Sequence, residues 1–231
     1  ENIFVTAGIS STLDLLCTLF TQAGDTIFVE ETTYFVAPRI FADHHLNIIP
    51  IAMDKNGLVI ESLEENLRIQ KPKFIYTIPI HHNPTGTTLI EPRRIRLMEL
   101  AQQFDFLILA DEVYQLLSYR ENPPKPFATH IDNENVISLG SFSKILAPGL
   151  RLGWIQAHAN IIKRLVTSGL LDSGGGMNPF TSAIVRGMLE SGDLEKHVYT
   201  LIETYRPRLQ TMDSMLRQHL TNITYTVPKG G

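Results

Sequence analysis

Short apolar runs that end on polar residues constrain the fold of this chain more than any other feature. Leu107–Ala110 is such a run, and it ends on Asp111 and Glu112. Strands that are apolar throughout are typical of parallel sheets buried on both faces. Further strand-like runs occur, between helical patterns, at 3–6, 26–30, 47–51, 74–78, 136–139 and 152–157. The pattern predicts an α/β fold, a three-layer α/β/α sandwich around a mostly parallel sheet.

Helices are predicted between and after these strands. The first is expected to be capped by Ser10 or Ser11 and to run to Thr21. Others are predicted over 60–69, 92–104, 161–168, 179–190 and 194–219, the last interrupted at Pro207. The polar, proline-rich segment 118–129 is interpreted as an exposed excursion, and 173–178 as a glycine-rich connector between two helices.

Composition narrows the function classes. With 231 residues and 43% hydrophobic content, the chain is long enough for one large domain, 1–231. A net charge of −4 gives no indication of nucleic-acid binding. No apolar run is long enough to span a membrane. Cys17 is the single cysteine, which favours a reducing compartment, here taken as the cytoplasm. No metal site is expected, since the adjacent histidines at 44 and 45 point apart on most backbones.

The run from Gly140 to Trp154 carries one lysine, Lys144, among small, hydroxylic and glycine residues. A lysine attacks a carbonyl only after losing its proton, so its pKa must be lowered by poor solvation or a nearby cation. Arg151 and the sparse polarity around Lys144 are consistent with such a site. A solvated loop lysine with a cationic neighbour would show the same pattern, and the other motifs of the chain are what favour Lys144 as the chemical centre.

Other polar groups follow predicted strands, where ligands gather in open α/β sheets. Gly8 lies between a strand and a helix, an order that suits an anion, because a helix start offers unpaired N–H groups. Tyr34 follows the run 26–30, and Asn83 lies in the loop His82-Asn-Pro-Thr-Gly86. Successive residues of a strand alternate, so one of Asp111 and Glu112 is expected to face the crevice while the other caps or pairs structurally.

With these motifs together, the sequence resembles the class I/II aminotransferases, fold-type I enzymes that use pyridoxal 5′-phosphate (PLP). The resemblance covers nearly the whole chain and is closest to the kynurenine, 2-aminoadipate and aromatic aminotransferase subgroup. It implies a cis bond at Asn83-Pro84. It also implies that this chain is the large, PLP-binding domain, without the N-terminal segment and small C-terminal domain of its relatives.

The resemblance carries roles onto individual residues. Lys144 would form a Schiff base with the cofactor and then move the substrate proton, and Asp111 would hold the pyridine nitrogen protonated. Asn83 and Tyr114 would hydrogen-bond the phenolic oxygen, and Tyr34 would stack on the ring.

The phosphate would be held by backbone N–H groups of Gly8, Ile9 and Ser10, by the hydroxyls of Ser10 and Ser141, and by Arg151. Many relatives have Gly-Ser-Gln where this chain has Gly8-Ile9-Ser10, so Ile9 can contribute only its backbone. A side chain at Gly8 is expected to crowd the approach of backbone to phosphate.

The implied function is transfer of an amino group from an L-amino acid to a 2-oxo acid, in a homodimer. In relatives, the region of 173–178 approaches the neighbouring active site. Two other interpretations stay open. A carbon–sulfur lyase, decarboxylase or racemase would use the same groups, and a transcriptional regulator would carry an aminotransferase-like domain that binds PLP without turnover.

Overall fold

The computed structural model describes residues 2–120, 123–171 and 176–231. Its main sheet has seven strands in the order β1-β9-β8-β7-β6-β2-β3. They span Ile3–Thr6 (β1), Thr26–Glu30 (β2), Asn47–Ile51 (β3), Phe74–Thr77 (β6), Leu107–Asp111 (β7), Val136–Ser141 (β8) and Gly153–Ala157 (β9). Only the pairings of β9, with β1 and β8, are antiparallel, so the predicted mostly parallel sheet is confirmed. A separate hairpin joins Met53–Asp54 (β4) to Gly57–Leu58 (β5).

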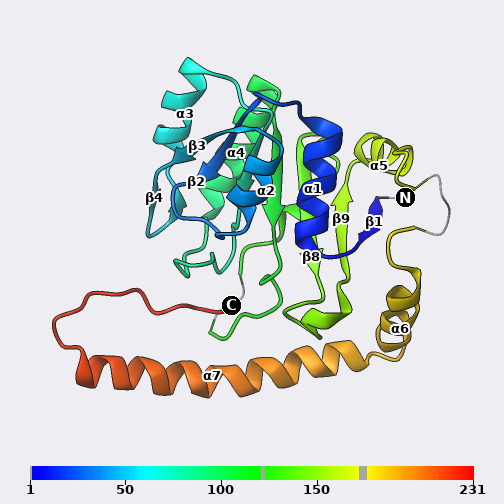
Figure 1. The fold of residues 1–231 in the computed structure, drawn as a ribbon. Coiled ribbons are helices and arrows are strands. Elements are labelled where there is room, and N and C mark those ends of the chain that lie inside the picture. The colour runs from blue at the N-terminus through cyan, green and yellow to red at the C-terminus, as the bar shows by residue number, and fades with distance from the viewer. Residues whose placement is uncertain (1, 121–122, 172–175) are drawn as a thin grey trace.

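Helices cover both faces of the sheet, as Figure 1 shows, which confirms the three-layer sandwich. Ile9–Phe20 (α1), Ala37–Asp43 (α2) and Ala159–Val166 (α5) pack on one face, and Ile60–Ile69 (α3) and Glu91–Phe104 (α4) on the other. Two neighbouring residues of β7 illustrate the arrangement, since Leu109 belongs to the core under α1 and Ile108 to the core under α4. Both faces are apolar because both are covered.

Two helices project from this body. Pro179–Glu190 (α6) leads into Asp193–His219 (α7), a long helix that runs below the sandwich in Figure 1 before an extended segment returns to it. Val185 is the buried residue of α6 and Leu194 that of α7, whereas apolar side chains such as Phe180 (79% exposed) are open to solvent.

The predicted interruption at Pro207 is wrong, because α7 continues through this residue. Proline cannot donate to the carbonyl of Glu203, four residues earlier. Pro207 is exposed, so water can satisfy that carbonyl and the helix is not forced to end.

The cap of α1 and the segment 118–129 differ from the predictions. Gly8, rather than Ser10 or Ser11, is the N-cap of α1, and no side chain caps this helix. Segment 118–129 is not simply exposed, because Tyr119 is buried and Phe127 fully buried at the start of a 3₁₀ turn, Phe127–His130. Of the predicted connector 173–178, positions 173–175 lie outside the described residues.

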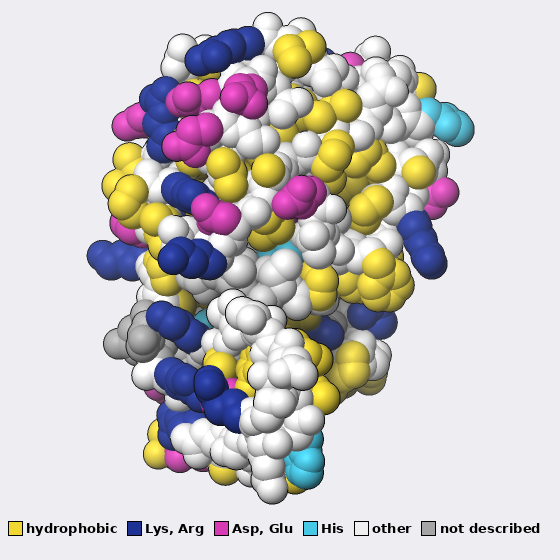
Figure 2. Space-filling model, turned by 90° about the vertical axis from the view of Figure 1, so that its left-hand side faces the viewer, with side chains coloured by type: hydrophobic (Ala, Val, Ile, Leu, Met, Phe, Trp, Pro, Cys, Tyr) yellow, Lys and Arg dark blue, Asp and Glu magenta, His cyan; other side chains and the backbone are white. Residues whose placement is uncertain are grey.

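The surface carries mixed charge, and Figure 2 shows acidic and basic side chains interspersed over the upper part of one face. Among the described residues, no helix is both long and apolar enough to cross a membrane.

Candidate active site

One cleft at the carboxyl ends of the parallel strands collects the predicted residues. Of the ten predicted site residues, only Gly8 and Ser141 are not among those that line it. The lining residues are Ile9, Ser10, Tyr34, Ile78, Asn83, Asp111, Val113, Tyr114, Ser143, Lys144, Pro148 and Arg151. They come from the ends of β2, β6, β7 and β8 and from the start of α1, so segments far apart in the sequence meet here.

Asp111 is the last residue of β7 and is only 4% exposed. Its Oδ2 accepts a hydrogen bond from the hydroxyl of Tyr76 at 2.7 Å. The N–H of Val113 lies near the carboxylate, yet Oδ1 is buried and has no hydrogen bond of normal geometry. Burial raises the pKa of Asp111 to about 6, partly opposed by the bond from Tyr76. Asp111 therefore presents one unsatisfied acceptor, which suits a cationic N–H donor.

Glu112 faces the other side of the sheet and has a structural role. Its Oε1 accepts the Phe127 N–H at 2.8 Å, and its Oε2 accepts the Ser138 hydroxyl at 2.6 Å. The buried guanidinium of Arg94 lies 3.8 Å from Oε1. Burial raises the pKa of Glu112, and these partners oppose that shift. The alternation expected for two successive strand residues thus separates the site carboxylate, Asp111, from the structural one.

Asn83 lies in a loop with the predicted cis bond to Pro84, which is confirmed. The Asn83 amide donates to the Tyr114 hydroxyl at 3.3 Å, so the two residues share one side of the cleft. Burial raises the pKa of Tyr114, and the bond from Asn83 lowers it in part. The same loop is anchored from below, where His82 Nε2 lies 2.9 Å from Glu30 Oε2 and both side chains are 1% exposed.

The start of α1 and Arg151 also line the cleft. The first N–H inside α1 to reach a carbonyl four residues earlier is that of Thr12, so those of Ile9 and Ser10 have no intrahelical partner. Arg151 adopts a left-handed backbone with φ 46°, and its Nη2 lies 3.4 Å from the carbonyl oxygen of Ala7. Two kinds of anion donor, helix N–H groups and a guanidinium, therefore converge.

Gly8 is required by this approach. Its φ is +88°, and a Cβ there would lie 2.7 Å from Nη2 of Arg151. The expected reason for the glycine was access of backbone to phosphate. The structure adds two others, since a φ of +88° strains any side chain at this position and a Cβ would force the end of the Arg151 side chain to shift.

Lys144 follows β8 in the loop that precedes the 3₁₀ turn Pro148–Leu150, and its Nζ lies 5.9 Å from the centre of the Tyr114 ring. Its side chain is exposed, so the poor solvation expected around it is not supplied by the described residues. An exposed amine in the cleft is accessible to an aldehyde.

Ser141 lies deeper than predicted. It is buried, does not line the cleft, and its Oγ lies 3.0 Å from Oγ of Ser143, which does line it. Tyr34 is half-buried at the wall of the cleft, with its ring edge-on to Phe35 at 5.2 Å between centroids. Ile9 packs its side chain against the core, which leaves its backbone N–H for a ligand.

Several residues of this site were not found by sequence reasoning. Ile78, Val113, Ser143 and Pro148 line the cleft, and Tyr76 lies beneath it. Tyr76 falls within a strand that is otherwise apolar, and nothing in the sequence shows that its hydroxyl meets Asp111. Adjacency of two strands in the sheet would have been the signal.

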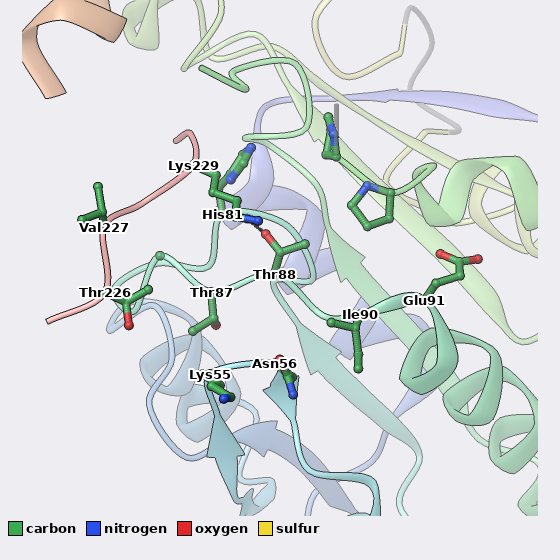
Figure 3. A pocket seen from close by; sticks show the side chains of 13 residues that line it. Lys55, Asn56, His81, Thr87, Thr88, Ile90, Glu91, Thr226, Val227 and Lys229 are labelled. Atoms are coloured by element: carbon green, nitrogen blue, oxygen red, sulfur yellow. Dashed lines mark hydrogen bonds between the residues drawn. The ribbon is translucent and has the colours of Figure 1, made fainter. Parts of the chain in front are cut away.

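A second, larger cleft is lined by residues on either side of the Asn83 loop in sequence, including His81, Thr87 and Thr88 (Figure 3). Lys55 and Asn56 of the β4–β5 turn and Thr226 and Val227 of the C-terminal segment lie on different sides of it. His81, which lines it, bonds Ser118 Oγ through Nε2 at 2.7 Å, and burial lowers its pKa to about 4. This cleft contains none of the predicted site residues. Within the described part of the chain, no three His, Cys, Asp or Glu residues gather as metal ligands.

Comparison with known proteins agrees with this geometry. The family model for "Aminotransferase class I and II" matches residues 1–231. The aromatic-amino-acid aminotransferase 1 of Thermococcus litoralis is 38% identical over 100% of this chain and 56% of its own length. The α-aminoadipate aminotransferase of Thermus thermophilus, solved in complex with N-(5′-phosphopyridoxyl)-L-leucine, superimposes with a TM-score of 0.90 at 28% identity, over 100% of this chain and 60% of that one.

A relative of another kind also matches. The uncharacterized HTH-type transcriptional regulator YdfD of Bacillus subtilis is 28% identical over 100% of this chain and 48% of its own length. The chain thus spans about half the length of the curated relatives it matches. Fold, site and family model agree, and the chain belongs to the class I and II aminotransferases.

Proposed function

We propose that the protein carrying this chain is a PLP-dependent aminotransferase that moves an amino group from an L-amino acid to a 2-oxo acid. The observation that carries the proposal is the cleft itself. It brings an accessible lysine, a carboxylate with one unsatisfied oxygen, Asp111, and an anion site formed by Arg151 and the start of α1 into one cleft. That residues 1–231 are the large domain of a longer protein is part of the same proposal.

The cleft fits PLP by the chemistry of its donors and acceptors. The unpartnered Oδ1 of Asp111 matches a protonated pyridine nitrogen, and the Arg151 guanidinium with the N–H groups of α1 matches a phosphate dianion. Gly8, with no room for a side chain beside Arg151, is consistent with a close-fitting phosphate cup. When bound, PLP supplies an electron sink for the charge left at the substrate Cα after its proton is removed.

Asp111 would stabilise the proton on the pyridine nitrogen of the ring. Its carboxylate is removed from water, so an ion pair to a pyridinium is stronger there than it would be at the surface. The negative charge of Asp111 keeps the nitrogen protonated, and the N–H restores the hydrogen bond that Oδ1 lacks.

Lys144 is the point of covalent attachment, and its freed amine acts as the general base and acid at the substrate Cα. In the absence of other shielding from the described residues, binding of cofactor and substrate must exclude water from this exposed amine. Arg151 lines the same cleft.

Asn83 and Tyr114 orient the phenolic oxygen of the ring as a pair, because the amide already donates to the Tyr114 hydroxyl. Tyr34, which lines the cleft, would offer its aromatic face to the ring. Phosphate binding is assigned to Arg151, to the N–H groups of Gly8, Ile9 and Ser10, and to the Ser10 hydroxyl. The buried Ser141 hydroxyl donates to Ser143 Oγ, so it can donate to the anion only if that hydrogen bond is given up.

The function is tested on the purified protein with its cofactor. Amino acids are added one at a time, and the absorption of the bound cofactor is followed as it changes from the pyridoxal to the pyridoxamine form. A 2-oxo acid should then reverse the change. Lys144→Ala should abolish both half-reactions, whereas Lys55→Ala, in the second cleft, should leave them intact. If no amino acid converts the cofactor, the aminotransferase proposal fails.

The similarity to YdfD supports one rival, a regulator that binds PLP without turnover. A regulator would react covalently with the cofactor at Lys144 and show no reversal by 2-oxo acids. Binding of a specific DNA operator, retained in Lys144→Ala or modulated by the cofactor, would favour it. A lyase or decarboxylase has less support from the comparisons.

A homodimer and a cytoplasmic location belong to the same proposal. Apolar side chains on α6 and α7, including Phe180, Ile184, Tyr199 and Met212, are exposed, and their burial in an interface would favour association. Light scattering of the purified protein tests the dimer. The buried thiol of Cys17, whose pKa burial raises to about 12, needs no oxidising compartment.

A further inference from the structure

Tyr76 lies on β6, beside the strand that carries Asp111. It is paired with Leu109 in the parallel ladder, and Asp111 lies two residues further along β7 on the same face. The ring is fully buried, and its hydroxyl reaches across to Oδ2 of Asp111 at 2.7 Å. Among the described residues, Tyr76 is the one side chain that donates to this carboxylate.

A second buried carboxylate shows what Asp111 lacks. Glu30, at the end of β2, accepts the Thr77 hydroxyl on Oε1 at 2.6 Å and the Ile78 N–H on Oε2 at 2.9 Å, and His82 Nε2 lies 2.9 Å from Oε2. Both oxygens of Glu30 are therefore occupied. Oδ2 of Asp111 accepts the Tyr76 hydroxyl, whereas Oδ1 has no hydrogen-bond partner among the described residues. Oδ1 is therefore available to a ligand.

We infer that Tyr76 is a positioning residue, whose hydroxyl fixes the Asp111 carboxylate in its ionised form with Oδ1 directed at the cofactor nitrogen. The assignment rests on the proposed PLP site for its functional meaning. The hydrogen bond itself does not depend on that proposal, so the two can fail separately.

Tyr76 affects the protonation of Asp111 through the pKa of its carboxyl group. Burial, with smaller contributions from the charges of Glu112 and Glu30, raises the pKa of Asp111, and the Tyr76 hydroxyl is the largest influence that lowers it. Burial and the neighbouring Asp111 raise the pKa of Tyr76 itself, so it stays a neutral donor. Without the hydroxyl, Asp111 would be protonated over more of the neutral range and could no longer balance a pyridinium.

Tyr76→Phe removes the hydroxyl and keeps the ring. The titration of Asp111 is followed in the cofactor-free protein by carboxyl ¹³C NMR, with the signal assigned by its loss in Asp111→Asn. We expect the midpoint to rise by about one pH unit, since a hydrogen bond to a charged group contributes about that much. Tyr119→Phe is the matched control. Tyr119 is also buried, but its hydroxyl donates to the carbonyl oxygen of Gly231, so the Asp111 midpoint should not move.

PLP affinity gives the second readout. Below about pH 7, Tyr76→Phe should bind PLP up to about tenfold more weakly than wild type, and the two should converge as pH rises and Asp111 ionises in both. A merely structural role would weaken binding by the same factor at every pH. In an Asp111→Asn background, Tyr76→Phe should cause no further pH-dependent loss.

The outcomes are separable. An unchanged Asp111 midpoint in folded Tyr76→Phe overturns the inference, whatever the catalytic result. If the midpoint rises but neither protein binds PLP, Tyr76 controls Asp111 and the proposed function is what fails. If Tyr76→Phe does not fold, 3-fluorotyrosine at position 76 keeps the ring and donates more strongly. The midpoint should then fall, and a midpoint that stays in place or rises overturns the inference.

Discussion

Replacement of Asp111 by asparagine should stabilise the cofactor-free protein near neutral pH while it destroys the ring contact. Burial raises the pKa of Asp111 from 3.8 to about 6 in the folded state. For a group whose folded pKa is raised, the stability is fully present below the unfolded pKa and is lost as pH rises through the folded pKa. The ionised carboxylate therefore costs the folded state roughly 3 kcal/mol above about pH 7.

Urea denaturation of cofactor-free protein, followed by the fluorescence of the single tryptophan, Trp154, measures this cost. From about pH 4 to about pH 8, wild type should lose roughly 2–3 kcal/mol of unfolding free energy relative to Asp111→Asn. Asp43→Asn, at an exposed position, is the control and should track wild type. Parallel curves for wild type and Asp111→Asn would refute the reasoning that Asp111 is held ionised at the expense of stability.

Two other substitutions test the fold around the site. Gly8→Ala places a Cβ at 2.7 Å from the Arg151 guanidinium with φ at +88°, so it should lower PLP affinity at least about tenfold and the unfolding free energy by roughly 1–3 kcal/mol. Gly187→Ala, where a Cβ meets nothing within 4 Å, is its control, and an unaffected Gly8→Ala contradicts the close fit. Pro207→Ala restores a donor inside α7 and should raise thermal stability, by up to about 3 kcal/mol; a loss of stability would mean that the proline is needed for the helix path.

Local sequence patterns predicted most of the fold because the apolar runs are strongly bounded. β1, β2 and β3 occupy the expected residues, and so do the helices predicted over 60–69 and 179–190, which are α3 and α6. The misses have local causes. The cap of α1 is Gly8, whose φ of +88° favours glycine, and no side chain caps the helix. Pro207 did not break α7 because its missing bond is exposed to water.

The sequence predicted which residues form the site, but not the hydrogen bonds and ion pairs between them. Each motif lies at a strand end, and the parallel sheet brings those ends to one edge, so Asn83, Asp111 and Lys144 meet in one cleft. Partners within the sheet depend on strand order, which the sequence does not state. For this reason the bond from Tyr76 to Asp111, the pairing of Glu30 with His82 and the depth of Ser141 emerged only from the structure.

The most direct test of the account is the covalent link at Lys144. The protein purified with PLP is reduced with borohydride, digested, and its peptides are weighed by mass spectrometry. We predict that the phosphopyridoxyl mass is carried by the peptide that contains Lys144, and that Lys144→Ala shows no such adduct. An adduct confined to other lysines, or none at all in a protein that binds PLP, would contradict the assignment of Lys144 as the reactive amine.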